Sequence, residues 1–250
     1  YGPSIKSFNE LIDKGVKIIF TVDCGTLSFE AIEHAKKKNI DVIVLDHHQS
    51  EINLPKAFSI INPNRIDDNS NLQYLCAAGV TFIFLVSMNK ALRDCGWFVQ
   101  NKIQEPNLIN YLDLVSLGTV CDVVPLIGLN RALVKQGLKI LKKKKNLGLK
   151  TLLDICKIEA IPSIYHLGYM LGPRINAGGR VGKCSHGANL LLNTDPKKVF
   201  KIASELDQYN KERQILEKDL LQKILNEIEN YSKDPVLVLS GKNWHEGVIG

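Results

Sequence analysis

One stretch of this sequence constrains the fold more than any other. It is an apolar run, Val42-Ile43-Val44-Leu45, that ends abruptly in Asp46, His47 and His48. A short run of β-branched and aliphatic residues is typical of a strand buried on both faces of a parallel sheet. The polar residues after it then lie at the carboxyl edge of the sheet, where open α/β sheets bind ligands. Because an Asp-His-His triplet is also found in ordinary strand-end turns, its meaning depends on what else reaches that edge.

A second strand end brings another carboxylate to the same place. Residues 16–22 are predicted to form a buried strand that ends in Asp23-Cys24-Gly25-Thr26, and residues 28–38 follow with the period of a helix before the strand at 40–45. Such a strand–helix–strand unit has a right-handed crossover and two parallel strands. Asp23 and His47 are therefore expected at one edge of the sheet.

The remaining first half is predicted to supply helices and a third strand. Ser7 and Glu10 have the spacing of a capping box, which predicts a short helix over residues 7–14, and residues 58–61 are predicted to form the third strand. The helix at 76–94 is apolar on nearly every side, so it is expected to be central and buried. A helix at 108–117 leads to Asp122, which stands alone among apolar residues and would need a cation or strong donors if buried.

The second half is predicted to be helical. The expected elements are a helix at 130–145 that ends in four solvated lysines, short helices near 149–156 and 186–192 that bracket a loop at 172–180, a long helix at 196–231, and a new strand at 236–239. The apolar stripe of the long helix, with residues three or four apart, is expected to pack in a core or between domains.

Composition sets outer limits on these predictions. A 250-residue chain with 45% hydrophobic and 23% charged residues is typical of a globular protein with one large or two ordinary domains. There is no apolar run of about 20 residues and no secretory pattern, so a cytoplasmic protein without membrane contact is expected. The six scattered cysteines are interpreted as reduced and mostly buried thiols. A net charge of +6 permits a polyanionic partner without requiring one.

The polar residues at the sheet edge are the mixture that suits a divalent metal. Asp23, His47 and Asp122, with His48 beside them, combine carboxylates with imidazoles, and this combination favours Mn²⁺ or Mg²⁺. Each residue also has an ordinary explanation, because Asp23 could be a turn residue, His47 a helix cap and Asp122 a buried acceptor. Three such coincidences at one edge are a weaker explanation than a metal site.

Three of these segments resemble the motifs of a known superfamily. Val22-Asp23-Cys24-Gly25, Leu45-Asp46-His47-His48 and the segment from Gly118 to Leu126 resemble the second, third and fourth motifs of the DHH phosphoesterases. Within that superfamily, the long fourth motif, the Gly-Pro-Arg-Ile-Asn-Ala-Gly-Gly-Arg segment at 172–180 and the closing Trp-His-Glu-Gly-Val-Ile-Gly resemble the exonucleases specific for single-stranded DNA.

The resemblance implies an architecture and a set of site residues. It implies an α/β fold with a parallel sheet flanked by helices at 1–195, a long connecting helix at 196–232, and the start of a second, truncated α/β domain at 233–250. Asp23 would bridge two metal ions, His47 and Asp122 would complete the shell of the second ion, His48 would face the scissile phosphate, and Asp46 would orient the histidines. The residues implied in binding DNA are Arg174, Asn176 and Arg180.

The resemblance also implies an activity and its limits. The expected reaction is two-metal hydrolysis of phosphodiesters, 5′ to 3′, on 5′-phosphorylated single-stranded DNA in recombination and repair, by a monomer with repair proteins as partners. The first motif of the superfamily would precede Tyr1, so this fragment is expected to be inactive alone. Two alternatives stay open: a phosphodiesterase of the same superfamily for oligonucleotides or small phosphates, and a noncatalytic DNA-binding scaffold. The roles of Tyr1 and His245 are not assigned.

Overall fold

The computed structural model describes residues 2–181, 183–228, 236, 238–242 and 244. Its contacts divide the chain into two compact units, Tyr1–Ile140 and Leu141–Gly250, and each unit is described here by itself. The boundaries expected at residues 195 and 232 stay a prediction.

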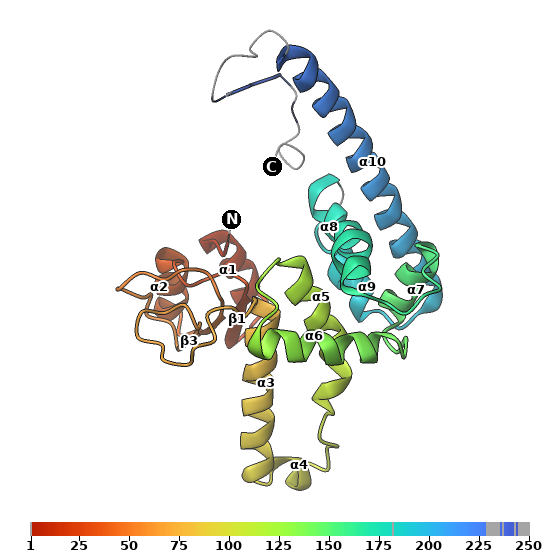
Figure 1. The fold of residues 1–250 in the computed structure, drawn as a ribbon. Helices are drawn as coiled ribbons and strands as arrows, with labels where there is room; N and C mark the ends of the chain where they lie inside the picture. The colour runs from red at the N-terminus through yellow and green to blue at the C-terminus, as the bar shows by residue number, and fades with distance from the viewer. Residues whose placement is uncertain (1, 182, 229–235, 237, 243, 245–250) are drawn as a thin grey trace. The chain divides into compact units, whose positions relative to one another are not determined.

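The first unit combines a small sheet with helices (Figure 1). Its elements are α1 (Ile5–Ile12), β1 (Ile18–Val22), α2 (Phe29–Lys37), β2 (Asp41–Leu45), β3 (Ser59–Ile61), α3 (Ala77–Asp94), α4 (Trp97–Gln100), the 3₁₀ helix η1 (Leu108–Tyr111), α5 (Leu112–Cys121) and most of α6 (Gly128–Leu141).

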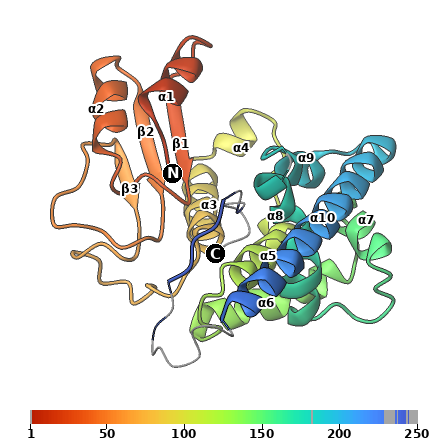
Figure 2. The same ribbon diagram turned by 90° about the horizontal axis from the view of Figure 1, so that it is seen from above.

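The predicted parallel sheet is confirmed. The strands lie in the order β1-β2-β3, side by side in Figure 2, and both pairs are parallel. Val22 of β1 is in register with Leu45 of β2, so the two strands end level with each other. The residues that follow them, Asp23 and Asp46, therefore start from the same edge.

The first strand, predicted to be buried, is buried on one face only. In β1 only Ile19 and Thr21 are buried, whereas Ile18, Phe20 and Val22 are about half exposed. Ile19 belongs to the core beneath α1 and α2, and alternation along the strand turns Phe20 to the opposite face, where its ring lies 6.1 Å from that of Phe84 in α3. Among the described strands β1 is an edge strand, which explains why its second face is less covered.

The first helix begins earlier than predicted. Its N-cap is Ser4, whose hydroxyl accepts a hydrogen bond from the amide of Ser7 at 3.2 Å, while the hydroxyl of Ser7 accepts one from the amide of Ser4 at 3.0 Å. The capping box thus uses Ser4 and Ser7 in place of Ser7 and Glu10, because a serine at the fourth position can satisfy the N-cap amide as a glutamate does.

Helix α3 is less buried than its composition predicts. Its buried residues are Ala77, Gly79, Val80 and Asn89, while Val86 and Met88 are exposed. Residues of its first turns pack against α5, where the Gly118 Cα lies so close to Ala78 that an added Cβ would meet the methyl of Ala78 at 2.7 Å. The carboxyl-terminal half continues away from that contact, so its apolar residues have less to pack against.

Helices α5 and α6 pack at close range in a second core cluster of the first unit. Leu112 and Val115 of α5 pack against Leu133 and Ile140 of α6. Gly137 makes this approach feasible, because a Cβ added there would lie 2.2 Å from the carbonyl oxygen of Leu112. This packing fixes the position of α5 and therefore of its C-cap residue, Asp122.

The second unit is helical in its described part. Its elements are α7 (Leu147–Ile155), the π-helix η2 (His166–Leu171), α8 (Gly172–Val181), α9 (His186–Leu192) and α10 (Pro196–Ile228). Its core is formed by fully buried leucines of α7, η2 and α9 together with residues of α10 (Leu149, Leu152, Leu153, Leu167, Leu171, Leu190, Val199, Ala203 and Leu206). The apolar stripe of α10 is buried only in this first half, since Leu216 and Leu225 are exposed.

Three further predictions for this half need correction. The segment at 172–180 is helical and not a loop; Pro173 is compatible with this helix because it lies in the first turn of α8, where proline is tolerated. Lys142–Lys145 follow the end of α6 at Leu141 and are outside the helix. Residues 238–242 have no strand, and the rest of the strand predicted at 236–239 includes residue 237, which lies outside the described residues.

Two smaller observations complete the fold. Of the six cysteines only Cys76 is buried, and none of the six forms a disulfide, so the prediction of mostly buried thiols is wrong. Among the helices formed by described residues, none has the combination of length and apolar character that crossing a bilayer requires.

Replacing Gly137 by alanine is expected to destabilise the protein by roughly 1–3 kcal/mol, because the added methyl overpacks the α5–α6 contact and outweighs the better helix propensity of alanine. Urea unfolding followed by circular dichroism measures the change. Gly179→Ala is the matched control, since that helical glycine has no atom within 4 Å of an added Cβ and should gain up to about 1 kcal/mol. Equal effects of the two substitutions would contradict the packing argument.

Candidate metal centre

The best-satisfied polar group in the first unit is the carboxylate of Asp46, directly after β2. It is 1% exposed. One oxygen accepts hydrogen bonds from the amide of Thr26 at 3.0 Å and from its hydroxyl at 2.7 Å. The other accepts from the amides of His47 and His48 and lies 2.7 Å from Nδ1 of His48. Burial alone would raise the pKa of Asp46, but these bonds outweigh it and hold that pKa at about 2, so the group is an anion.

His48 is oriented by that anion. With Nδ1 bonded to Asp46, its other ring nitrogen, Nε2, is directed away from the carboxylate, and 53% of the side chain is exposed. The hydrogen bond to Asp46 raises the pKa of His48 above its ordinary value, and the negative charges of Asp23 and Asp122 act in the same direction. The imidazole of His48 is therefore exposed at the sheet edge in a fixed orientation, and its hydrogen bond to Asp46 determines its tautomer.

His47 lies between two carboxylates. Its Nε2 is 3.1 Å from Oδ1 of Asp23 and 3.5 Å from Oδ2 of Asp122, and its side chain is 13% exposed. The amide of Asp23 donates a hydrogen bond to the carbonyl of Leu45, which extends the β1–β2 hydrogen bonding by one residue. The backbone of Asp23 has φ 62°, a left-handed conformation that aspartate tolerates better than most residues. Parallel strand ends thus bring Asp23 and His47 together, as predicted.

Asp122 reaches the same place from a helix end and is partly exposed. It is the C-cap residue of α5, and 36% of its side chain is exposed. Partial burial and the charge of Asp23 raise the pKa of Asp122, while His47 opposes the rise. Asp122 is partly exposed because the neighbouring residues Cys121 and Val123 are themselves exposed where the helix ends.

This donor set fits a divalent cation. Ligand atoms of Asp23, His47 and His48 all lie within 4.8 Å of one another, and Asp122 adds a second carboxylate beside His47. Carboxylate oxygens suit Mg²⁺ and Mn²⁺, and imidazole nitrogens shift the preference toward Mn²⁺. Asp46 stands behind the imidazoles, the usual position for a carboxylate that orients metal-ligating histidines.

Three residues behind this set were not assigned a role from the sequence. Thr26 donates to Asp46, and Asn62 Nδ2 donates both to the hydroxyl of Thr26 and to the carbonyl of His48, at 2.9 Å in each case. Asn64 Nδ2 donates to the carbonyl of His47. The Asn-Pro-Asn turn after β3 could have indicated the two asparagines, because a third strand in the same parallel sheet must also end at this edge.

The residues predicted to bind DNA lie in the second unit. Nε of Arg174 donates to Asp207 at 2.8 Å, and its Nη1 donates to the carbonyl of Met170 at 2.8 Å, so the guanidinium is largely engaged within the unit. Asn176 is exposed on α8. The side chain of Arg180, together with Tyr1 and His245, lies outside the described residues. Their role in binding DNA stays a prediction.

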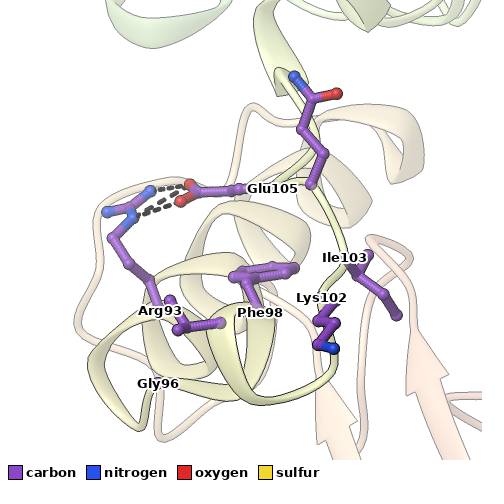
Figure 3. Close-up of a pocket in the computed structure, with 8 residues that line it drawn as sticks. Arg93, Gly96, Phe98, Lys102, Ile103 and Glu105 are labelled. Carbon is purple, nitrogen blue, oxygen red and sulfur yellow. Dashed lines mark hydrogen bonds and ion pairs between the residues drawn. The ribbon is translucent and has the colours of Figure 1, made fainter.

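Two cavities of the first unit differ in their relation to this set. One of about 500 Å³ is mainly apolar, is bounded by the end of β1, α3 and α5, and has Asp23 and Asp122 in its wall. The other, of about 400 Å³, lies at the end of α3 and is shown in Figure 3. Arg93 and Glu105 in its wall pair with each other, and Lys102 also lines it. Of these two cavities, the first lies beside the candidate ligands Asp23 and Asp122.

Comparison with known families agrees with this geometry. Residues 3–119 match the family described as "DHH family, N-terminal domain". Over these residues the chain is similar to the DHH family. The chain is 39% identical to the single-stranded-DNA-specific exonuclease RecJ of Escherichia coli and 38% identical to that of Dickeya dadantii; each match covers the whole chain and 44% and 45%, respectively, of the relative. It therefore spans less than half of these relatives.

Solved structures give the same result for the fold. The crystal structure of RecJ from Thermus thermophilus in complex with Mn²⁺ matches 99% of this chain with a TM-score of 0.82 and 29% identity, over 35% of that protein's chain. The complex of RecJ from the same organism with Mg²⁺ matches with a TM-score of 0.70 and 28% identity. The predicted α/β fold with a parallel sheet and flanking helices is thereby confirmed.

The low pKa of Asp46 predicts a specific loss of stability in acid. Because its pKa in the folded protein is about 2 and its ordinary value is 3.8, the stabilisation is present above pH 3.8 and is lost as the pH falls toward 2. The loss is on the order of 2 kcal/mol. Urea unfolding between pH 2 and 5 in the presence of a chelator measures it. Asp46→Asn should be less stable at pH 5 and should lack this part of the pH dependence; an unchanged acid profile in the variant would contradict the role of Asp46.

Backbone strain next to Asp122 makes a second prediction. Val123 has φ 59° at the position after the C-cap, where glycine is usual, and its side chain is 87% exposed. Val123→Gly is expected to raise the free energy of unfolding by about 1 kcal/mol, since it removes the left-handed penalty and loses little packing. Thermal unfolding measures the shift. Val99→Gly is the control: this valine is 83% exposed but helical, so the change should cost a few tenths of a kcal/mol.

Proposed function

We propose that this protein is a metal-dependent exonuclease that hydrolyses phosphodiester bonds of single-stranded DNA. One observation carries the proposal: Asp23, His47 and Asp122, from two strand ends and one helix end, converge within ion-pair distance at the carboxyl edge of a parallel sheet. Similarity over the whole chain to exonucleases named as specific for single-stranded DNA supports the substrate.

Each side chain has a part in this proposal. Asp23, His47 and Asp122 would hold the metal, Mn²⁺ or Mg²⁺, in a two-metal site of which Asp23 is the shared ligand. A bound divalent cation supplies charge neutralisation at the phosphate and activation of the attacking nucleophile. His48 faces the scissile phosphate and donates from Nε2 to its oxygen, since the raised pKa favours the protonated ring. Asp46 is a positioning residue that fixes both histidines.

The direction and setting of the reaction complete the proposal. We infer digestion from a 5′-phosphorylated end in the 5′ to 3′ direction, by a monomer, during DNA recombination and repair with other repair proteins. The support for this finer description is the likeness of the motifs around Asp23, His48 and Asp122 to those of exonucleases specific for single-stranded DNA.

The experiment uses protein expressed from the complete reading frame and two labelled forms of one single-stranded oligonucleotide. With Mn²⁺, a 5′-labelled strand should release its label as a mononucleotide at once, whereas a 3′-labelled strand should shorten progressively. A blunt duplex should be resistant, and a chelator should stop the reaction. Cleavage of dinucleotides alone would favour the small-phosphodiesterase alternative, and no cleavage by the wild-type protein would favour the scaffold.

Variants of the candidate ligands test the site itself. Asp122→Asn should abolish measurable activity and weaken Mn²⁺ binding, because it removes a negative ligand while keeping the size of the side chain. Asp46→Asn should lower activity by roughly 10- to 100-fold, the effect usual for a carboxylate that supports a ligating histidine. Glu51→Gln, an exposed acid near the site in sequence, is the control and should retain activity. Full activity in Asp122→Asn would remove that residue from the site.

A further inference from the structure

Two exposed tyrosines of the second unit lie stacked on each other without an evident structural use. The rings of Tyr165 and Tyr169 have centroids 5.2 Å apart and planes inclined by 27°. Tyr165 is 61% exposed and Tyr169 is 74% exposed. Neither phenol has a hydrogen-bond partner among the described residues. An aromatic pair that contributes so little to the core is a surface available to a ligand.

The segment that carries the pair is firmly held. Leu167 and Leu171, on the other side of η2, are fully buried, so the tyrosines face solvent while the leucines anchor the π-helix. The carbonyl of Met170 accepts a hydrogen bond from Arg174, which is also ion-paired with Asp207 of α10. Burial would raise the pKa of Asp207, but its bonds with Lys211 and Arg174 outweigh this and lower it, so the ion pair is maintained. The rings therefore project from a rigid base.

The charge of the chain is concentrated in the same unit. Residues 141–250 contain 18 Lys and Arg against 12 Asp and Glu, whereas residues 1–140 contain 14 of each, so the whole net charge of +6 belongs to the second unit. A basic surface attracts the phosphates of a nucleic acid, and exposed aromatic rings stack with its unpaired bases. π-helical segments are also frequent at functional sites.

We propose that Tyr165 and Tyr169 form a stacking platform for the bases of single-stranded DNA. This inference rests on the proposed function and adds to it a set of base-contacting residues in the second unit. Stacking uses the face of any base, so the platform would bind without sequence preference and would require unpaired bases. Arg174 acts here as a positioning residue, through its bonds to Met170 and Asp207.

The test separates bases from phosphates. Fluorescence anisotropy measures binding of the protein from the complete reading frame to a 3′-labelled dT₁₂ strand and to an abasic strand with the same number of phosphates, in the presence of a chelator. The wild-type protein should bind dT₁₂ more tightly. The double variant Tyr165→Ala and Tyr169→Ala should bind dT₁₂ roughly tenfold more weakly or worse, and the abasic strand as the wild type does.

Two controls make the result specific to the rings. Replacing both tyrosines by phenylalanine keeps the ring faces and should preserve affinity within about twofold, because the hydroxyls are not needed for stacking. Phe200→Ala removes another aromatic ring of the second unit, 61% exposed on α10, and should also leave affinity unchanged. Circular dichroism establishes that the double alanine variant is folded; if it is not, the single variants Tyr165→Ala and Tyr169→Ala are each expected to show part of the loss.

The outcomes distinguish this inference from the function on which it rests. Equal affinity of the wild type and the alanine variants for dT₁₂, with exonuclease activity intact, overturns the platform and leaves the proposed function in place. An equal loss on dT₁₂ and on the abasic strand also overturns it, because the effect would then not come from the bases. A wild-type protein that neither binds nor digests single-stranded DNA overturns both.

Discussion

The hydrogen bonds of one buried carboxylate hold the candidate metal centre together. Asp46 accepts from Thr26 on one side and from His47 and His48 on the other, so one anion links the turn after β1 to the end of β2. Asn62 ties the end of β3 into the same network through Thr26. A buried anion is stable only when such donors surround it. Here the donors belong to the same turns and strand ends that position the candidate metal ligands.

Both carboxylates beside His47 are next to strained backbone. Asp23 itself is in the left-handed region, and Val123 directly follows Asp122 in the same conformation. For a β-branched residue this conformation is unfavourable and persists only when the surrounding structure imposes it. The close packing of α5 on α6 at Gly137 fixes the helix that ends at Asp122. Convergence of the two carboxylates thus depends on packing at a distance from the site.

The two units divide charge and chemistry between them. The first unit has no net charge and contains the carboxylate–imidazole set on a parallel sheet, while the second is basic, helical in its described part, and carries the stacked tyrosines. The proposed activity on a polyanion would benefit from this division, because anionic metal-binding side chains and cationic residues would neutralise each other if they were mixed.

The sequence by itself determined the parallel sheet and the meeting of Asp23 with His47, because a strand–helix–strand unit leaves little choice of handedness and parallel strands end at one edge. It also indicated Asp122, but not how exposed that residue is. Only the tertiary structure decided what depends on contacts between distant segments: the Thr26 and Asn62 bonds behind the histidines, and the exposed faces of β1 and α3. The segment at 172–180, predicted to be a loop, is helical, and Gly178 lets this helix, α8, pack closely on Leu206 of α10. The stacking of Tyr165 on Tyr169 likewise follows from the π-helical turn and its buried leucines, which no local pattern specified.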